Sequence, residues 1–202
     1  MFSIVVLASG NGSNFQAVVD AIDNGVIGNA KISKLICNNK RAYVLERARE
    51  NGIESILVDT KNNDYNKIIS TVLEAESPDL ILLDGYMRIL PDYIIDKYPF
   101  KMINLHPSLL PAFGGKGYYG SKVHEAVIKS GARYSGCTVH FATNDVDNGP
   151  IIDQRIVEVT DDDTPESLEE KVHMEEHKSL VNSINLIITG KYKILGKRVI
   201  RE

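Results

Sequence analysis

Short apolar runs rich in Val, Ile and Leu alternate with amphipathic segments along the first half of the chain. The runs are continuously apolar, which is typical of parallel strands that are buried on both faces of a sheet. We expect five such strands, at residues 2–8, 31–37, 56–58, 80–83 and 102–106. Apolar residues recur at helical spacing between them, so we expect helices at residues 13–24, 41–51 and 64–76. The pattern predicts an α/β fold with a Rossmann-like, mostly parallel sheet flanked by helices.

The pattern changes in the second half of the chain. Two strands are expected at residues 135–142 and 151–159, and because no helix separates them we expect antiparallel pairing there. A long helix follows, for which Thr164 is a suitable N-cap and Gly190 marks the end. The basic stretch 191–202 fits either a short strand or a frayed tail.

The composition is that of an ordinary globular protein. A length of 202 residues fits one domain, and we expect residues 1–202 to form it. The chain has 23 Lys and Arg against 27 Asp and Glu, a formal net charge of −4 at pH 7. This balance speaks against a general nucleic-acid binder, which usually carries a basic surplus.

Metal, membrane and disulfide roles find no support in the sequence. Cys37 and Cys137 lie far apart and fit no metal-ligand spacing, so we expect neither a zinc site nor a disulfide framework. The apolar N-terminal run lacks a basic leader and is too short to span a bilayer. We therefore expect no metal, no membrane partner and a cytoplasmic location.

The segment Ser9-Gly10-Asn11-Gly12-Ser13-Asn14 joins the first expected strand to the first expected helix. Its glycines allow a sharp turn, and N–H groups at the start of a helix favour an anion such as phosphate. The segment lacks both the full dinucleotide fingerprint and the P-loop lysine. A plain turn in which Ser13 or Asn14 caps the helix is the alternative.

A second candidate segment, Gly85-Tyr86-Met87-Arg88-Ile89-Leu90, follows the fourth expected strand. Ligands of open α/β sheets bind beyond the carboxyl ends of the strands. Met87, Ile89 and Leu90 could line an apolar slot for a flat heterocycle, whose edge would be recognised by backbone groups. The alternative is a packed corner between a strand and a helix.

Asn104 and His106 stand at the end of the fifth expected strand, where residues two apart project to the same face. A neutral amide donor and a proton carrier on one face could stabilise an oxyanion and move a proton, as acyl transfer requires. A carboxylate beside His106 would favour its imidazolium form. Asp145 and Asp147 are the candidates, and we choose Asp147 because a sharp Asn-Gly-Pro turn follows it. A structural Asn and His, and solvated aspartates, are the alternatives.

An acid interrupts the apolar face of the long helix. Glu176 lies four residues from both Val172 and Leu180, and His173 lies three residues before it. A buried acid needs a partner. A ligand hydroxyl or amine would serve, as would an internal Arg or Lys.

The chain closely resembles the phosphoribosylglycinamide formyltransferases over nearly all of its 202 residues. The motifs that carry the resemblance occur in order at Ser9–Asn14, Gly85–Leu90, Asn104–Pro111, Val139–Phe141 and Asp147–Pro150. The resemblance implies transfer of the formyl group of 10-formyltetrahydrofolate to the amine of glycinamide ribonucleotide in purine synthesis. It also implies small-molecule substrates, no metal, no nucleic acid, and a monomer or homodimer.

The resemblance also implies roles for individual residues. Those expected in catalysis are Asn104, His106 and Asp147. Those expected to bind the ribonucleotide are Gly12, Ser13, Asn14, Glu176 and His173. Those expected to bind the folate are Met87, Arg88, Ile89, Leu90, Asn104 and Gly115. Two departures from the family pattern concern ligand contacts. The loop Gly114–Gly120 is longer and richer in Gly and Tyr than is usual. The basic folate contact, expected in the region 61–64, is not fully matched, and Lys61 or Asn62 could serve.

Other functions remain as alternatives. A methionyl-tRNA formyltransferase would need a further C-terminal domain, and a formyltetrahydrofolate deformylase would normally carry an N-terminal regulatory domain. A sugar-nucleotide formyltransferase and a non-catalytic phosphometabolite-binding protein are also conceivable. The combination of Asn104, His106 and Asp147 speaks against simple binding, which does not require these groups.

Overall fold

The computed structural model describes all residues from Met1 to Glu202. The chain forms two compact units, Met1–Ile103 and Asn104–Glu202, which are described separately. The fold is α/β and Rossmann-like, as predicted: a mostly parallel sheet is flanked by helices, and antiparallel strands lie toward the C-terminal part.

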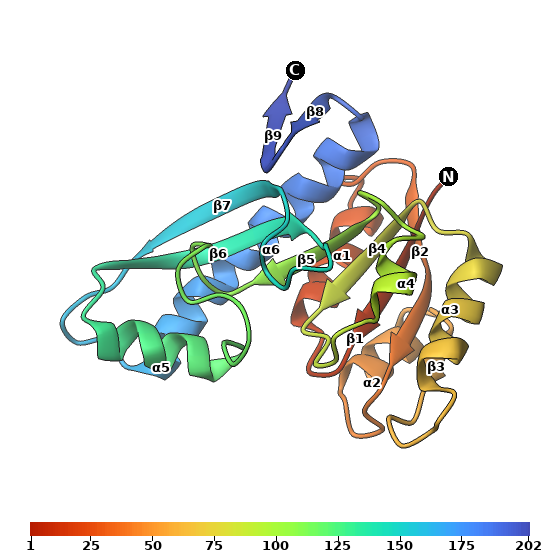
Figure 1. Ribbon diagram of the computed structural model, residues 1–202, viewed down its shortest axis with the longest axis horizontal. Coiled ribbons are helices and arrows are strands. Elements are labelled where there is room, and N and C mark those ends of the chain that lie inside the picture. Colours follow the sequence, from red (N-terminus) through yellow and green to blue (C-terminus); the bar gives the residue numbers. More distant parts are fainter. The chain divides into compact units, whose positions relative to one another are not determined.

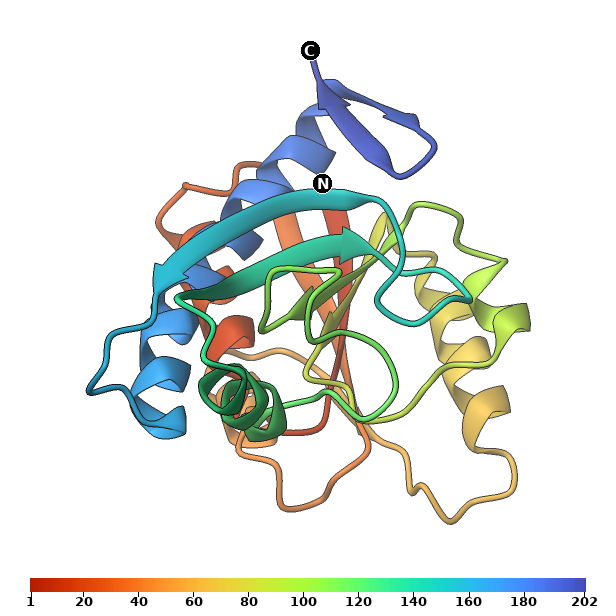
Figure 2. The same ribbon diagram turned by 60° about the vertical axis from the view of Figure 1, so that its left-hand side comes forward.

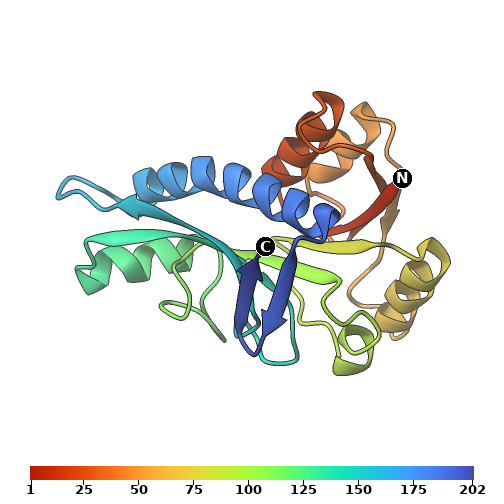
Figure 3. The same cartoon turned by 90° about the horizontal axis from the view of Figure 1, so that it is seen from above.

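The first unit contains four strands in the order β3-β2-β1-β4 and four helices. In chain order its elements are β1 (Phe2–Ala8), α1 (Ser13–Asp23), β2 (Ala30–Cys37), α2 (Val44–Glu50), β3 (Ser55–Leu57), α3 (Tyr65–Glu76), β4 (Leu80–Asp84) and α4 (Asp92–Ile95). Helices α1 and α2 cover one face of these strands, and α3 lies on the other (Figures 1 and 3). The side chains from Ile4 to Ala8 are fully buried, which explains the continuous apolar run of β1.

The parallel register of the first unit brings strand ends together. Ala8, the last residue of β1, pairs with Cys37 of β2 and with Asp84 of β4. The segments that follow β1 and β4 therefore leave the sheet side by side, at the carboxyl ends where ligands of such sheets bind.

Strand β5 (Met102–His106) begins in the first unit and ends in the second. The remaining elements of the second unit are α5 (Ser121–Ser130), β6 (Tyr134–Phe141), β7 (Ile151–Glu158), α6 (Pro165–Thr189), β8 (Tyr192–Leu195) and β9 (Arg198–Arg201). Strands β6 and β7 pair antiparallel from Tyr134–Glu158 to His140–Ile151, as predicted, and run side by side in Figure 2. Helix α6 packs along both of them, and α5 contacts α6.

Capping explains where α6 begins. The Thr164 side chain accepts from the Ser167 N–H, and the Ser167 hydroxyl accepts from the Thr164 N–H, so the two residues form a reciprocal capping box. Gly190 ends the helix in a left-handed conformation with φ of 65°. Both predicted boundaries are confirmed.

The alternative in which Ser13 or Asn14 caps α1 does not hold. The N-cap is Gly12, with φ of 76° and no side-chain hydrogen bond to the helix. A Cβ atom at this residue would lie 2.4 Å from Val44 Cγ2. The tight approach of α2 therefore selects a glycine at the position where a capping side chain would otherwise stand.

Helices α4 and α5 were not predicted, and of the two alternatives for residues 191–202 the strand holds, as the hairpin of β8 and β9. Strand β9 pairs with β7 only at Ile151 and Arg198. Cys37 and Cys137 are free and buried. No helix is both long enough and apolar enough to span a membrane.

Candidate active site

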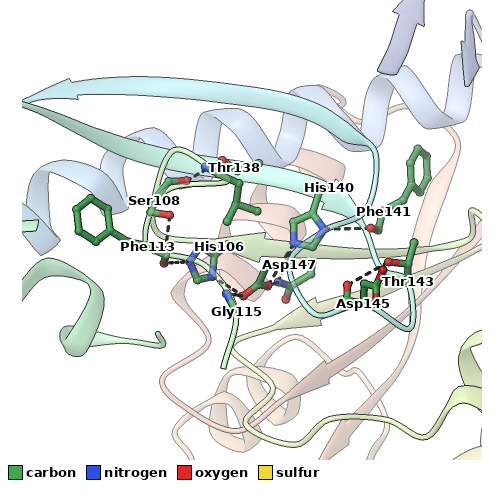
Figure 4. Close-up of polar contacts among 12 residues, drawn as sticks. His106, Ser108, Phe113, Gly115, Thr138, His140, Phe141, Thr143, Asp145 and Asp147 are labelled. Atoms are coloured by element: carbon green, nitrogen blue, oxygen red, sulfur yellow. Dashed lines mark hydrogen bonds and ion pairs between the residues drawn. The ribbon is translucent and has the colours of Figure 1, made fainter. Parts of the chain in front are cut away.

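In the second unit, two of the three predicted catalytic side chains lie beside the carboxylate of the third, Asp147, and Figure 4 shows His106 on that carboxylate. Asn104 Nδ2 lies 3.3 Å from Asp147 Oδ1, and His106 Nδ1 lies 3.5 Å from Asp147 Oδ2. Asn104 and His106 thus reach the same group from the end of β5. His106 is only 4% exposed, so its ring is held by protein contacts rather than by solvent.

The loop between β6 and β7 sets the position of Asp147. Asp147 has φ of 55°, and a Cβ atom at Gly149 would lie 1.8 Å from the Phe141 carbonyl oxygen. Gly149 therefore allows the loop to fold back onto the end of β6. Asp145 is exposed, and its carbonyl accepts from the Thr143 hydroxyl, so Asp147 and not Asp145 faces His106.

The Asp147 carboxylate is stabilised as an anion. Burial acts to raise the pKa of Asp147, but the side chains of His140 and His106 and the Gly115 N–H lower it by more, so the pKa lies below its ordinary value. The Gly115 N–H donates to Asp147 Oδ2 over 2.9 Å. Gly115, which we expect beside the folate, thus contacts the Asp147 carboxylate.

His106 has an acceptor at each ring nitrogen. Nδ1 faces Asp147, and Nε2 lies 2.8 Å from the Phe113 carbonyl oxygen, to which it must donate because a carbonyl only accepts. Both nitrogens can donate at once only in the imidazolium form. The Ser108 hydroxyl donates to the carbonyls of Ala112 and Phe113, which fixes the turn after the Leu110–Pro111 cis peptide bond.

His140, at the end of β6, is a further member of the cluster that sequence reasoning missed. Its Nδ1 donates to the Phe141 carbonyl over 3.0 Å, while Nε2 lies 3.2 Å from Asn104 Nδ2 and 3.6 Å from Asp147 Oδ1. The Asn104 amide therefore has two acceptors, His140 and Asp147, which orient its N–H groups. The Val-His-Phe motif was visible in the sequence, but nothing in its spacing connected it to Asn104.

Glu176 lies on α6 and is 6% exposed. Its Oε2 lies 3.0 Å from His173 Nδ1, one helical turn earlier. His173 is therefore one partner of this acid, in addition to the alternatives that the sequence offered, and the contact of Glu176 with a ligand stays a prediction. Glu176 and His173 form a polar pair on the face of α6 that otherwise packs through Val172 and Leu180.

In the first unit, the residues expected at a phosphate surround the start of α1. Asn14 is buried, and Gly12 and Ser13 are half-buried. Helix α2 supports this loop from outside: the Val44 N–H donates to Gly10 O over 3.2 Å, and Arg47 donates to the backbone and side-chain oxygens of Asn11. The loop thus presents the N-terminus of a helix from a braced backbone, an arrangement that suits an anion.

The residues expected at the folate differ in exposure. Met87, Arg88 and Ile89 are exposed, with 56% for Met87 and 72% for Ile89, whereas Leu90 is buried. Large apolar side chains in this state suit contact with an apolar ligand. The Arg88 guanidinium lies 5.2 Å from the centre of the Tyr65 ring, and the hydroxyls of Tyr65 and Tyr86 are hydrogen-bonded.

The cluster around Asp147 supplies the groups of an acyl-transfer site: an amide donor, a protonatable ring and a buried carboxylate that orients both. No group of three or more His, Cys, Asp or Glu side chains is arranged to hold a metal ion. Together with the α/β fold, the groups around Asp147 define the class of the protein as an enzyme that transfers an acyl group.

A model of the formyl transferase family matches residues 2–184, and the chain belongs to this family. It is 39% identical over 195 residues to the chloroplastic phosphoribosylglycinamide formyltransferase of Arabidopsis thaliana, covering 94% of this chain and 66% of the relative. It is 37% identical over 182 residues to the phosphoribosylglycinamide formyltransferase of Bacillus subtilis, covering 88% of this chain and 90% of the relative. The solved structure of glycinamide ribonucleotide transformylase 1 from Symbiobacterium toebii matches with a TM-score of 0.92 at 36% identity, over 100% of this chain and 94% of that chain.

The length of the match differs between relatives. The chain spans 66% of the Arabidopsis protein and 19% of the trifunctional purine biosynthetic protein adenosine-3 of Bos taurus. These relatives are thus longer than the chain.

Proposed function

We propose that the protein transfers the formyl group of 10-formyltetrahydrofolate to the amine of N1-(5-phospho-D-ribosyl)glycinamide, in the synthesis of purine nucleotides. The observation that carries the proposal is the contact of Asn104 and His106 with the single carboxylate of Asp147. Such a group of donors suits an acyl carbon whose oxygen gains negative charge. The names of the relatives from Arabidopsis and Bacillus support formyl transfer and the ribonucleotide acceptor, and the folate donor is what the resemblance to this family implies.

The neutral amine of the ribonucleotide attacks the formyl carbon, and a carbon–nitrogen bond forms. The formyl oxygen becomes an oxyanion, which accepts hydrogen bonds from the Asn104 amide and from a His106 ring N–H. Since Nε2 of His106 donates to the Phe113 carbonyl and Nδ1 faces Asp147, one of these N–H groups turns to the oxyanion during the reaction.

The intermediate then collapses. The bond between the formyl carbon and N10 of the folate breaks, and the proton lost by the attacking amine is delivered to N10 through His106 or a water. Asp147 keeps the charge of His106 compensated throughout, because its carboxylate is ionised and held by the Gly115 N–H. Tetrahydrofolate and the N-formyl ribonucleotide are the products, and no metal takes part.

The remaining residues are assigned to the two substrates. Gly12, Ser13 and Asn14 hold the phosphate at the start of α1, and Glu176 with His173 contacts the ribonucleotide. Met87, Arg88, Ile89 and Leu90 contact the folate, which covers the exposed Met87 and Ile89. Gly115 contributes by holding Asp147, and Lys61 or Asn62 supplies the polar folate contact.

The proposal extends to the organisation of the protein. Residues 1–202 act as one formyltransferase domain, which the family match across residues 2–184 supports. The partners are the small-molecule substrates, and the active form is a monomer or a homodimer. A cytoplasmic location stays a prediction of the sequence, since the Arabidopsis relative is named as chloroplastic.

An assay of folate release tests the proposed function. Purified protein is mixed with 10-formyltetrahydrofolate, with and without glycinamide ribonucleotide, and release of tetrahydrofolate is followed spectroscopically. We expect release only when the ribonucleotide is present. Release without the ribonucleotide would instead support a formyltetrahydrofolate deformylase, and no release under either condition would contradict both activities.

A further inference from the structure

Ser9 joins β1 to the loop that we assign to the ribonucleotide phosphate, and it is only 8% exposed. Its hydroxyl oxygen accepts from the Met87 N–H over 2.9 Å. Met87 stands in the middle of the segment that we assign to the folate. The Ser9 side chain, just before the phosphate loop that holds Gly12, Ser13 and Asn14, thus fixes the backbone of the folate segment, Met87–Leu90.

A second hydrogen bond joins the same two parts of the unit, with the donor now on the side of α1 and the acceptor at the end of β4. Asp84, the last residue of β4, accepts with Oδ2 from the Phe15 N–H in the first turn of α1, over 3.1 Å. Asp84 is 7% exposed, and Phe15 is fully buried. Besides the bond between Ser9 and Met87, a hydrogen bond thus links the start of α1 to the end of β4, at the strand ends that the pairing of Ala8 with Asp84 brings together.

Hydrogen bonds from Asn39 and from the start of α2 hold the backbone at the start of the phosphate loop. The Asn39 amide donates to the Ser9 carbonyl over 3.1 Å, and the Val44 N–H donates to the Gly10 carbonyl over 3.2 Å. A phosphate at the start of α1 therefore further restrains a backbone to which Ser9 is already joined. Through the Ser9 hydroxyl, the same restraint reaches the exposed segment around Met87.

We propose that Ser9 is a positioning residue that couples the phosphate loop to the folate segment, so that each substrate binds more tightly when the other is bound. The inference rests on the proposed function, which assigns these two segments to the two substrates. When the first substrate binds, it restrains the motion of both segments, and the second substrate binds to a segment whose motion is already restrained. By thermodynamic linkage, the gain in affinity is the same whichever substrate binds first.

Calorimetric titration of a dead-end pair measures the coupling. Glycinamide ribonucleotide is titrated into the protein alone and into protein saturated with tetrahydrofolate, which has no formyl group to transfer. We expect the folate to lower the dissociation constant of the ribonucleotide about five- to tenfold in the wild type, in the ordinary range for coupled sites. In Ser9→Ala the Met87 N–H loses its acceptor, and the two dissociation constants should agree within about twofold.

Two variants separate positioning from general damage. Ser9→Thr keeps a hydroxyl acceptor and should retain the coupling, whereas Ser33→Ala removes a hydroxyl that donates to the Ile4 carbonyl in the same unit and should leave it unchanged. Loss of coupling in Ser33→Ala, or retained coupling in Ser9→Ala, would overturn the assignment to Ser9.

The wild type alone also tests the proposal, should Ser9→Ala not fold. Hydrogen exchange of the Met87 amide should slow when ribonucleotide is added without folate, because that amide donates to Ser9. Unchanged exchange at Met87 would overturn the coupling. Binding of both ligands with no mutual effect would overturn it too while leaving the proposed function intact, and binding of neither ligand would contradict the proposed function itself.

Discussion

Asp147 Oδ2 lies 3.5 Å from His106 Nδ1, although the two residues stand 41 positions apart in different elements of the second unit. The same carboxylate also faces His140 and the amide of Asn104. Asp147 is therefore the common neighbour of every donor that the proposed reaction uses, which makes its charge the first property to test.

Asp147→Asn keeps the size of the side chain and removes its charge. We expect turnover to fall about 10²- to 10⁴-fold, because His106 loses the anion that compensates its charge as an imidazolium. Steady-state kinetics with both substrates measures the loss. Asp145→Asn, in the same loop but with an exposed side chain, is the matched control and should retain wild-type turnover.

His140→Ala should lower turnover about tenfold while changing both KM values by less than about twofold, since the lost acceptor orients Asn104 without being assigned to a substrate. His140→Gln returns a side-chain oxygen that can accept from the Asn104 amide, and it should recover part of the loss. Equal damage in the Ala and Gln variants would remove the orienting role of His140.

Glu176→Gln tests the ribonucleotide side. The variant loses a charged acceptor that lies 3.0 Å from His173, and we expect KM for the ribonucleotide to rise about tenfold with KM for the folate unchanged. Glu175→Gln is the control, because Glu175 pairs with Lys178 on a neighbouring position of α6. A rise confined to the folate KM would contradict the assignment of Glu176.

Asp163 stabilises the start of the helix that carries Glu176. Hydrogen bonds from Lys171, Ser167 and Thr160 hold the pKa of Asp163 well below its ordinary value of 3.8. A carboxyl whose pKa is lowered by folding stabilises the folded state above its unfolded pKa, and that contribution is lost as the pH falls through the folded pKa. Asp163→Asn should therefore cost about 1 kcal/mol at pH 7, the size of a helix N-terminal interaction.

The pH dependence of the cost is the sharper part of this prediction. The difference in free energy of unfolding between wild type and Asp163→Asn should shrink as the pH is lowered below 3.8, as measured by urea unfolding at several pH values. Asp162→Asn, at the exposed neighbouring residue, should show no such difference. A gap that stays constant with pH would show that the charge of Asp163 is not its source.

The strands and the long helix could be predicted because their signals are local. A continuous apolar run of a few residues is enough to predict β1. In the same way, the two ends of α6 could be predicted from Thr164 and Gly190 alone. Helix α5 was missed because it begins directly after the glycine-rich stretch that ends at Gly120. The C-terminal hairpin was ambiguous because its basic residues touch β7 at one paired position only.

The candidate site was predictable only in part, for the same reason. The spacing of Asn104 and His106 on one strand predicted that they share a face. The turn after Asp147 favoured this residue as the carboxylate beside His106. The role of His140 depends on where the end of β6 lies relative to Asn104, and the partnership of Ser9 with Met87 depends on the register of β1 and β4. Neither contact can be predicted from the residues that neighbour it in the sequence.

The destination of the formyl carbon tests the central claim most directly. 10-Formyltetrahydrofolate labelled with ¹³C in the formyl group is incubated with the protein and glycinamide ribonucleotide, and the products are followed by NMR and mass spectrometry. We expect the label to appear in the formamide of the ribonucleotide, in an amount equal to that of the tetrahydrofolate released. Label recovered as free formate, with the ribonucleotide unchanged, would contradict it.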